Sequence, residues 1–145
     1  MQEKYYSNKL YPLQDSVLRI VEAVPNSFYL TGGTALSRCY LHHRYSDDLD
    51  FFCNAASDFK EKTETILESV RKKFALKVPV IAPVFVQAFV HAEDVELKMD
   101  FVNDVQYRVE IPGPTALFIR TDTWMNILSN KLSALQRQAG RIWQI

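Results

Sequence analysis

Residues 31–52 read TGGTALSRCYLHHRYSDDLDFF, and the order of glycines, apolar residues and acids in this stretch decides the expected fold. The apolar run Phe28–Thr31 just before the glycines predicts a short strand. Gly32-Gly33 then predicts a turn, and a helix is expected from Thr34 to about Leu41. Asp48–Phe52 predicts a second strand, in which acids alternate with apolar residues.

Two carboxylates of this stretch, Asp48 and Asp50, are expected to lie on one face of the second strand. Side chains at positions i and i+2 point the same way, roughly 6–7 Å apart, while Leu49 and Phe51 face the other side. Unpaired carboxylates that close repel each other, which raises their pKa values. A divalent cation removes that cost, and carboxylate oxygens suit Mg²⁺ or Mn²⁺. We therefore expect Asp48 and Asp50 to bind a metal ion.

The glycine turn offers a place for an anion beside these acids. Gly32 and Gly33 lack Cβ atoms, so a ligand can approach the backbone closely. The helix that follows directs its N-terminal N–H groups and positive dipole at that place, and Thr34 adds a hydroxyl. A phosphate cradle next to metal-binding carboxylates is typical of metal-assisted phosphoryl or nucleotidyl transfer. A simpler alternative is that Gly32-Gly33 only forms a tight turn between the strand and the helix.

Two residues between the helix and the acids have open roles. Arg44 either clamps a phosphate or pairs with Asp48 and orients it. Ser46 either contacts the nucleotide or holds the turn. The neighbouring His42 and His43 are not expected to share a zinc ion, because adjacent helical residues point about 100° apart.

A third carboxylate is expected from a later strand. In Val95–Val102 the apolar residues share one face of the strand, and the polar residues Glu96, Lys98 and Asp100 share the other. Asp100 is the best candidate for a third metal ligand, because it lies next to the apolar end of its strand, as Asp50 does. Glu96 ranks below it.

The rest of the chain predicts further helices and strands. Helical spacing of apolar residues predicts a helix over Leu10–Val24, and Asp58-Phe-Lys-Glu61 resembles a capping box that opens another. That second helix is expected to bury Phe59, Ile66, Leu67, Val70 and Phe74. An extended run over Val78–Val90 contains two prolines, which favour a sheet edge or a bulge.

The C-terminal third is expected to hold one more strand and one more helix. Val105–Ile111 predicts a short strand, and Thr121 or Asp122 is expected to cap a helix that runs to about Gln138. The residues expected to face inward from it are Ile127, Leu128, Leu132 and Leu135. The order of elements predicts an α+β fold with a mixed β-sheet covered mainly on one face by helices.

Length and composition are those of an ordinary soluble protein. A chain of 145 residues is expected to form one domain, and its formal net charge of zero argues against a generally basic nucleic-acid coat. Cys39 and Cys53 form no CxxC pair and indicate reduced thiols in a cytosol-like compartment. Neither a signal peptide nor a membrane-spanning run is recognisable, so we expect a cytoplasmic protein that does not bind membranes.

The motif Gly32-Gly33-Thr34 followed by Arg44-x-Ser46-x-Asp48-Leu-Asp50-Phe resembles the signature of minimal DNA-polymerase-beta-type nucleotidyltransferases. More narrowly, it resembles the AbiEii/AbiGii toxin family. The late segment Asn130–Leu135, with Arg137 after it, is similar to that family's following motif. The resemblance therefore extends from about Phe28 to Arg137, which is most of the chain.

The resemblance implies a polymerase-beta-like nucleotidyltransferase core that uses Mg²⁺, or Mn²⁺, and a nucleoside triphosphate. It implies that Asp48, Asp50 and Asp100 hold the metal ions and that the triphosphate lies at Gly32, Gly33 and Thr34. Lys131 would contact phosphate or assist the transfer, although a surface role for this lysine is equally open. Because family members serve as toxins and related toxins modify transfer RNA, an antitoxin partner and an RNA acceptor are implied.

The C-terminus departs from the family pattern. In the family an acidic motif and further helices follow the lysine helix, whereas residues 138–145 contain no acid. We expect a single domain over residues 1–145 whose C-terminal helical lobe is truncated or absent. An inactive relative that binds a nucleotide or a protein is therefore the second hypothesis. A Mg²⁺-dependent phosphohydrolase is a weaker third, because no clear water-activating base is present.

Overall fold

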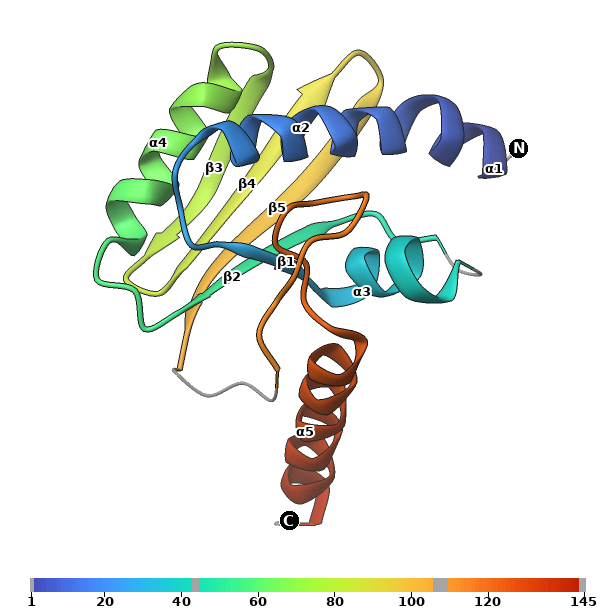
Figure 1. Ribbon diagram of the computed structural model, residues 1–145, viewed down its shortest axis with the longest axis vertical. Coiled ribbons are helices and arrows are strands. Elements are labelled where there is room, and N and C mark those ends of the chain that lie inside the picture. The colour runs from blue at the N-terminus through green and yellow to red at the C-terminus, as the bar shows by residue number, and fades with distance from the viewer. Residues whose placement is uncertain (1, 43–44, 106–109, 144–145) are drawn as a thin grey trace.

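The computed structural model describes residues 2–42, 45–105 and 110–143 (Figure 1). The elements in chain order are α1 (Gln2–Tyr5), the π-helical turn η1 (Tyr6–Leu10), α2 (Tyr11–Ala23), β1 (Tyr29–Thr31), α3 (Gly32–Ala35), the π-helical turn η2 (Leu36–Leu41), β2 (Leu49–Asn54), α4 (Phe59–Arg71), β3 (Ala75–Ala82), β4 (Phe85–Ala92), β5 (Val95–Asp104) and α5 (Trp124–Trp143). This order of helices and strands confirms the predicted α+β class.

The five strands form one mixed sheet in the order β1-β2-β5-β4-β3. Strands β2 and β5 are parallel, and every other neighbouring pair is antiparallel. Asp50 of β2 lies opposite Thr31 of β1 on one side and opposite Asp100 of β5 on the other. The sheet therefore brings together two acids that are far apart in the sequence.

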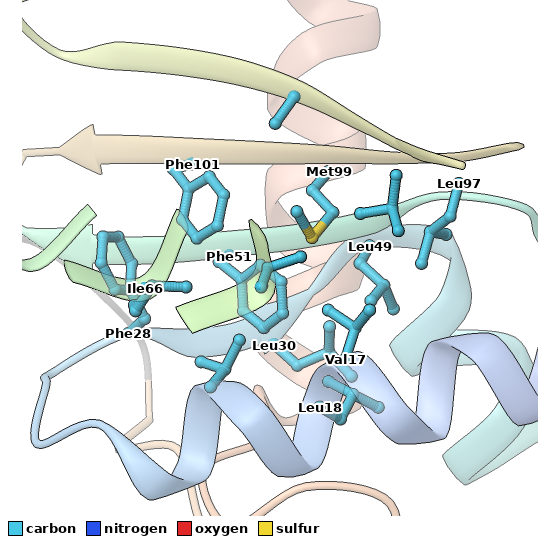
Figure 2. Close-up of a cluster of buried hydrophobic side chains, with 14 of the residues drawn as sticks. Val17, Leu18, Phe28, Leu30, Leu49, Phe51, Ile66, Leu97, Met99 and Phe101 are labelled. Carbon is cyan, nitrogen blue, oxygen red and sulfur yellow. The ribbon is translucent and has the colours of Figure 1, made fainter. Parts of the chain in front are cut away.

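Helices α2 and α4 cover one face of this sheet, and the core lies between them and the strands. Along β5 the alternate residues Val95, Leu97, Met99 and Phe101 are buried, as the period-two pattern predicted. Figure 2 shows Val17 and Leu18 of α2 and Ile66 of α4 packed against strand residues that include Leu49 and Phe51. The polar residues that alternate with these core positions consequently lie on the other face.

The prediction of one extended run over Val78–Val90 is wrong, because two strands form a hairpin there. β3 ends at Ala82 and β4 begins at Phe85, with Pro83 and an exposed Val84 at the turn. The expectation for Pro79 is confirmed: the register shifts between Lys77 and Val80, and β3 is an edge strand. Proline cannot donate a ladder hydrogen bond, so it is tolerated at such a place.

Some predicted boundaries shift. Helical structure precedes the predicted Leu10 start and continues through η1 into α2. The capping box at Asp58 is wrong: Asp58 precedes α4, but its side chain makes no capping hydrogen bond. Phe74 lies beyond the end of α4 and is only partly buried. Residues 106–109 of the predicted strand Val105–Ile111 lie outside the described residues.

Helix α5 contacts the rest of the molecule near its start and extends away from the sheet (Figure 1). It begins at Trp124, and Thr123 rather than Thr121 or Asp122 caps it: the Thr123 hydroxyl accepts a hydrogen bond of 3.1 Å from the Asn126 N–H. Ile127 is buried, as expected. The inward placement of three further residues is wrong, because each is 43–59% exposed: Leu128, Leu132 and Leu135.

Neither thiol is in a disulfide; Cys53 is buried and Cys39 is half-buried. Within the described ranges, no helix has the length and apolar character needed to cross a membrane.

Candidate active site

Asp50 lies at the centre of the acidic cluster, between β1 and β5. Its pKa is raised from 3.8 to about 6, first because the carboxyl is buried and then because Asp100 and Asp48 carry like charges nearby. The Lys98 ammonium opposes these effects. Burial and two neighbouring acids therefore disfavour the ionised form of Asp50, and a bound cation would stabilise that form.

The Asp50 side chain packs directly against Gly32. A Cβ atom at Gly32 would lie 2.3 Å from Asp50 Oδ2, which leaves no room for any side chain there. Gly32 also has a φ of +77°, a conformation that glycine adopts readily. The helix begins at Gly32, not at Thr34 as expected, and Thr31 precedes it as the N-terminal flanking residue. The Asp50 carboxylate thus fills the space in which a side chain at Gly32 would lie.

Asp48 and Asp100 share one cation, the ammonium of Lys98. Lys98 Nζ lies 3.4 Å from Asp48 Oδ2 and 3.8 Å from Asp100 Oδ2. Its pKa is raised, first by Asp100 and then by Asp48. Gln87 of β4 donates a hydrogen bond of 3.1 Å to the other oxygen of Asp100, Oδ1. Asp48, which was expected on the strand, immediately precedes β2.

Lys98 is a site residue that the sequence reasoning did not select. A usable signal was present, because Lys98 and Asp100 are two residues apart and strand side chains at that spacing share a face. The pairing of β2 with β5, which places Asp48 at the same lysine, has no comparable signal in the sequence.

Thr34 and Ser46 hold the segment that leads into the acids. Thr34 is fully buried, and its hydroxyl donates to the Asp48 carbonyl oxygen and is hydrogen-bonded to the Ser46 hydroxyl at 3.0 Å. A Cβ atom at Gly33 would lie 2.9 Å from Ser46 Oγ. The structure therefore uses both hydroxyls to position Asp48, which favours the turn-holding interpretation of Ser46.

The N-terminal helices hold the same segment from its other side. The Gln14 side chain of α2 donates to the carbonyl oxygens of Ser46 at 3.3 Å and Asp47 at 3.1 Å. The Tyr6 hydroxyl donates to the Asp47 carboxylate. Gln14 is fully buried although its side chain is polar, which the hydrogen bonds explain. Sequence reasoning missed Tyr6 and Gln14, since nothing local to either residue marks such distant partners.

The structure describes only one of the two basic residues predicted for the site. Arg44 lies outside the described residues. Lys131 is exposed on α5 and takes part in no ion pair in the described part of the chain. The start of α5 is tied to the glycine turn, since the Thr31 hydroxyl donates a 2.8 Å hydrogen bond to buried Asp122.

The residues that are described include no group of three histidine, cysteine or acidic side chains already arranged to hold a metal ion. The donor chemistry nevertheless suits a hard divalent cation, because the candidate ligands are carboxylate oxygens. The Lys98 ammonium lies within 4 Å of both Asp48 and Asp100, at a position where positive charge is electrostatically favoured. The raised pKa of Asp50, caused first by burial and then by Asp100 and Asp48, fits a place where a further cation would be favourable.

Comparisons with known proteins agree with this fold. The family model described as nucleotidyl transferase AbiEii toxin of type IV toxin–antitoxin systems matches residues 18–141. Two crystal structures from Helicobacter pylori, a candidate nucleotidyltransferase and JHP933, are similar to this chain, each with a TM-score of 0.63 and 18% sequence identity. Each comparison covers 86% of this chain but only 59% and 57% of theirs, so this chain spans less than two thirds of their length. At this identity the likeness concerns the fold alone. No curated protein matches the sequence.

Proposed function

This chain belongs to the AbiEii nucleotidyl transferase toxin family, and from that premise we propose that it transfers a nucleoside monophosphate from a nucleoside triphosphate to an acceptor hydroxyl. One observation carries the proposal: Asp50 and Asp100 are opposite each other in the register of the neighbouring strands β2 and β5. Gly32 packs against the carboxylate of Asp50. A glycine turn and acids from two strands thereby meet at one place.

Asp48, Asp50 and Asp100 are the residues that would hold Mg²⁺ or Mn²⁺. Such an ion, when bound, lowers the pKa of an acceptor hydroxyl and neutralises a leaving pyrophosphate. Lys98 holds Asp48 and Asp100 together and offsets their charge before a ligand arrives. The rigid hydrogen bonding of residues 46–48 keeps Asp48 in place for this role.

The triphosphate is proposed to bind beside Gly32 and Gly33 through backbone N–H groups, with Arg44 and Lys131 as the basic residues that offset its charge. Thr34 and Ser46 act by positioning the acidic segment rather than by exposing their hydroxyls. We further propose that residues 1–145 act as one nucleotidyltransferase domain in the cytoplasm. A cognate antitoxin and an RNA acceptor are the proposed partners.

Label transfer tests the proposal. The purified protein is incubated with each α-³²P-labelled nucleoside triphosphate, Mg²⁺ and bulk RNA, and label in RNA or protein is measured after electrophoresis. We expect Mg²⁺-dependent transfer that falls at least 100-fold in Asp50→Asn and Asp100→Asn, because carboxylates at a metal site carry the chemistry. A matched acid, Asp94, is exposed at a hairpin and serves as the Asp94→Asn control.

The second candidate, an inactive relative, makes a different prediction in the same experiment. Triphosphate would bind with no transfer to any acceptor, and Asp50→Asn would change only the affinity. Transfer at the wild-type rate in both Asp50→Asn and Asp100→Asn would reject the proposed active site.

A further inference from the structure

Four tyrosines gather beside the acidic segment. Tyr5, Tyr6 and Tyr11 come from the N-terminal helices, and Tyr45 comes from the segment that leads into Asp48. The Tyr6 ring centroid lies 5.3 Å from Tyr5, 5.5 Å from Tyr11 and 4.3 Å from Tyr45. Tyr6 is therefore the centre of the cluster, and only it is buried.

Tyr45 presents an open aromatic face within this cluster. Its ring is stacked on Tyr6 with an interplanar angle of 9°, so Tyr6 covers one face. Tyr11 lies against the same ring, with ring centroids 6.4 Å apart and an interplanar angle of 50°, and Tyr45 is still 43% exposed. We take this exposure to mean that the ring face opposite Tyr6 is open to a ligand. An exposed ring that stacks on a buried ring is already oriented, so a further planar group can stack on it with little loss of side-chain freedom.

Tyr45 lies close along the chain to the proposed reaction centre. Tyr45 precedes Asp48 by three residues, so their Cα atoms are at most about 10 Å apart. The segment between them cannot swing freely, because the Tyr6 hydroxyl donates to Asp47 and Gln14 donates to the Ser46 and Asp47 carbonyl oxygens. The same buried residues thus fix both the tyrosine ring and the acids.

One basic side chain, Arg38, contacts the tyrosine cluster at Tyr11. The Arg38 guanidinium lies 4.3 Å above the Tyr11 ring and pairs with Asp15 at 2.9 Å. Arg38 also lines a cavity of about 420 Å³ together with Arg19 and His42. Aromatic rings next to basic side chains are the combination by which proteins bind single-stranded nucleic acid and nucleotides.

We propose that the open face of Tyr45, supported from behind by Tyr6, is a stacking site for a nucleobase at the entrance to the acidic site. The base belongs either to the triphosphate or to an RNA acceptor, and the two sources share the same planar chemistry. Because stacking reads no hydrogen-bond pattern, the site accepts all four bases within a few-fold of one another. This inference rests on the proposed function for its ligand, but its test does not require turnover.

Binding is measured with two probes, each used without the other so that no transfer occurs. One is 2-aminopurine riboside triphosphate with Mg²⁺, and the other is a short single-stranded RNA that ends in 2-aminopurine. We expect Tyr45→Leu to weaken binding of at least one probe roughly 5- to 100-fold, the range for loss of one base–aromatic stack. Tyr45→Phe and Tyr45→Trp should bind as wild type. The probe affected identifies the source of the base.

Tyr5→Leu is the matched control, because Tyr5 is similarly exposed but meets Tyr6 edge-on, at 80°. It should leave both affinities within about twofold, the expected scatter for a variant outside the stack. Equal losses in Tyr5→Leu and Tyr45→Leu would attribute the effect to packing of the helices and overturn the proposal, as would wild-type binding of both probes by Tyr45→Leu. Thermal unfolding of each variant separates lost stacking from lost folding.

The test of the stacking site can succeed or fail independently of the test of nucleotidyl transfer. Selective loss of probe binding in Tyr45→Leu supports the stacking site even if no label is transferred to any acceptor. Label transfer with unchanged KM values for triphosphate and RNA in Tyr45→Leu rejects the stacking site and leaves the transferase proposal intact.

Discussion

The Asp50 carboxylate occupies the space that a side chain at Gly32 would need, with Oδ2 at 2.3 Å from the position of the missing Cβ. Gly32 is the first residue of α3, directly after β1, and Asp50 lies opposite Thr31 in the register of β1 and β2. The glycine and the acid are therefore parts of one packed unit. A change at either residue affects the geometry of the other.

Gly32→Ala should destabilise the protein by about 1–3 kcal/mol, since it combines a left-handed φ with a steric clash. The clash involves a partly buried carboxyl group, which cannot move away without approaching Asp100 or Asp48. Chemical denaturation measures the loss. Gly113→Ala is the control, because a Cβ atom at Gly113 meets nothing within 4 Å, and it should change stability by no more than about 0.5 kcal/mol. Equal stabilities of the two variants would contradict this packing.

Asp50→Asn should stabilise the metal-free protein at neutral pH. The folded-state pKa of about 6 lies above the ordinary value of 3.8, so the folded chain holds this proton more tightly than the unfolded chain. The free energy of unfolding of the wild type therefore falls as pH rises from about 4 to about 6. Asp50→Asn lacks this fall and should be about 1–3 kcal/mol more stable than wild type at pH 7.5.

The gap in stability between Asp50→Asn and wild type should narrow as pH falls towards 4 and close below that pH, where Asp50 becomes protonated in both the folded and the unfolded wild type. Urea denaturation in EDTA across this range measures it. Asp94→Asn provides the comparison, because Asp94 is exposed, pairs with Lys9 and has a lowered pKa. A gap that is constant with pH would show that Asp50 does not titrate near 6.

Thr34→Val should lower stability by about 1–3 kcal/mol although it keeps the shape of the side chain. The buried hydroxyl donates to the Asp48 carbonyl oxygen and is hydrogen-bonded to Ser46, and both partners lose it in the variant. Thr34→Ser keeps the hydroxyl and should retain most activity, whereas Thr34→Val should lower kcat through misplacement of Asp48. A rise in the KM for triphosphate with unchanged kcat and stability would instead indicate direct phosphate contact by Thr34.

Lys98→Met should increase the rise in unfolding temperature that Mg²⁺ causes. Without the ammonium, Asp48 and Asp100 lose their shared counter-charge, so the unfolding temperature in EDTA falls and the rise on adding Mg²⁺ becomes larger than in wild type. Differential scanning fluorimetry with and without Mg²⁺ measures both changes. Lys77→Met, at an exposed lysine of β3, should respond as wild type does. An unchanged Mg²⁺ response in Lys98→Met would argue against metal binding between these acids.

Local patterns predicted much of the fold, and they failed where a distant partner decides the outcome. Alternation along β5 correctly identified both faces of that strand, because successive side chains of a strand point to opposite sides wherever it lies. The same kind of reasoning placed Leu128, Leu132 and Leu135 in the core, where they are exposed. Helical spacing shows which residues share a stripe, but it does not show what covers that stripe.

The sequence by itself determined that glycines precede the acids and that Asp100 lies on the polar face of its strand, because these properties follow from residue order and from backbone periodicity over a few residues. Tertiary structure alone decided that β2 lies beside β5, which sets Asp50 opposite Asp100 and places Lys98 between acids. It also decided that Tyr6 and Gln14 hold the acidic segment. Such pairings depend on how α2 and the strands bury their apolar faces together, and that packing is a property of the whole chain.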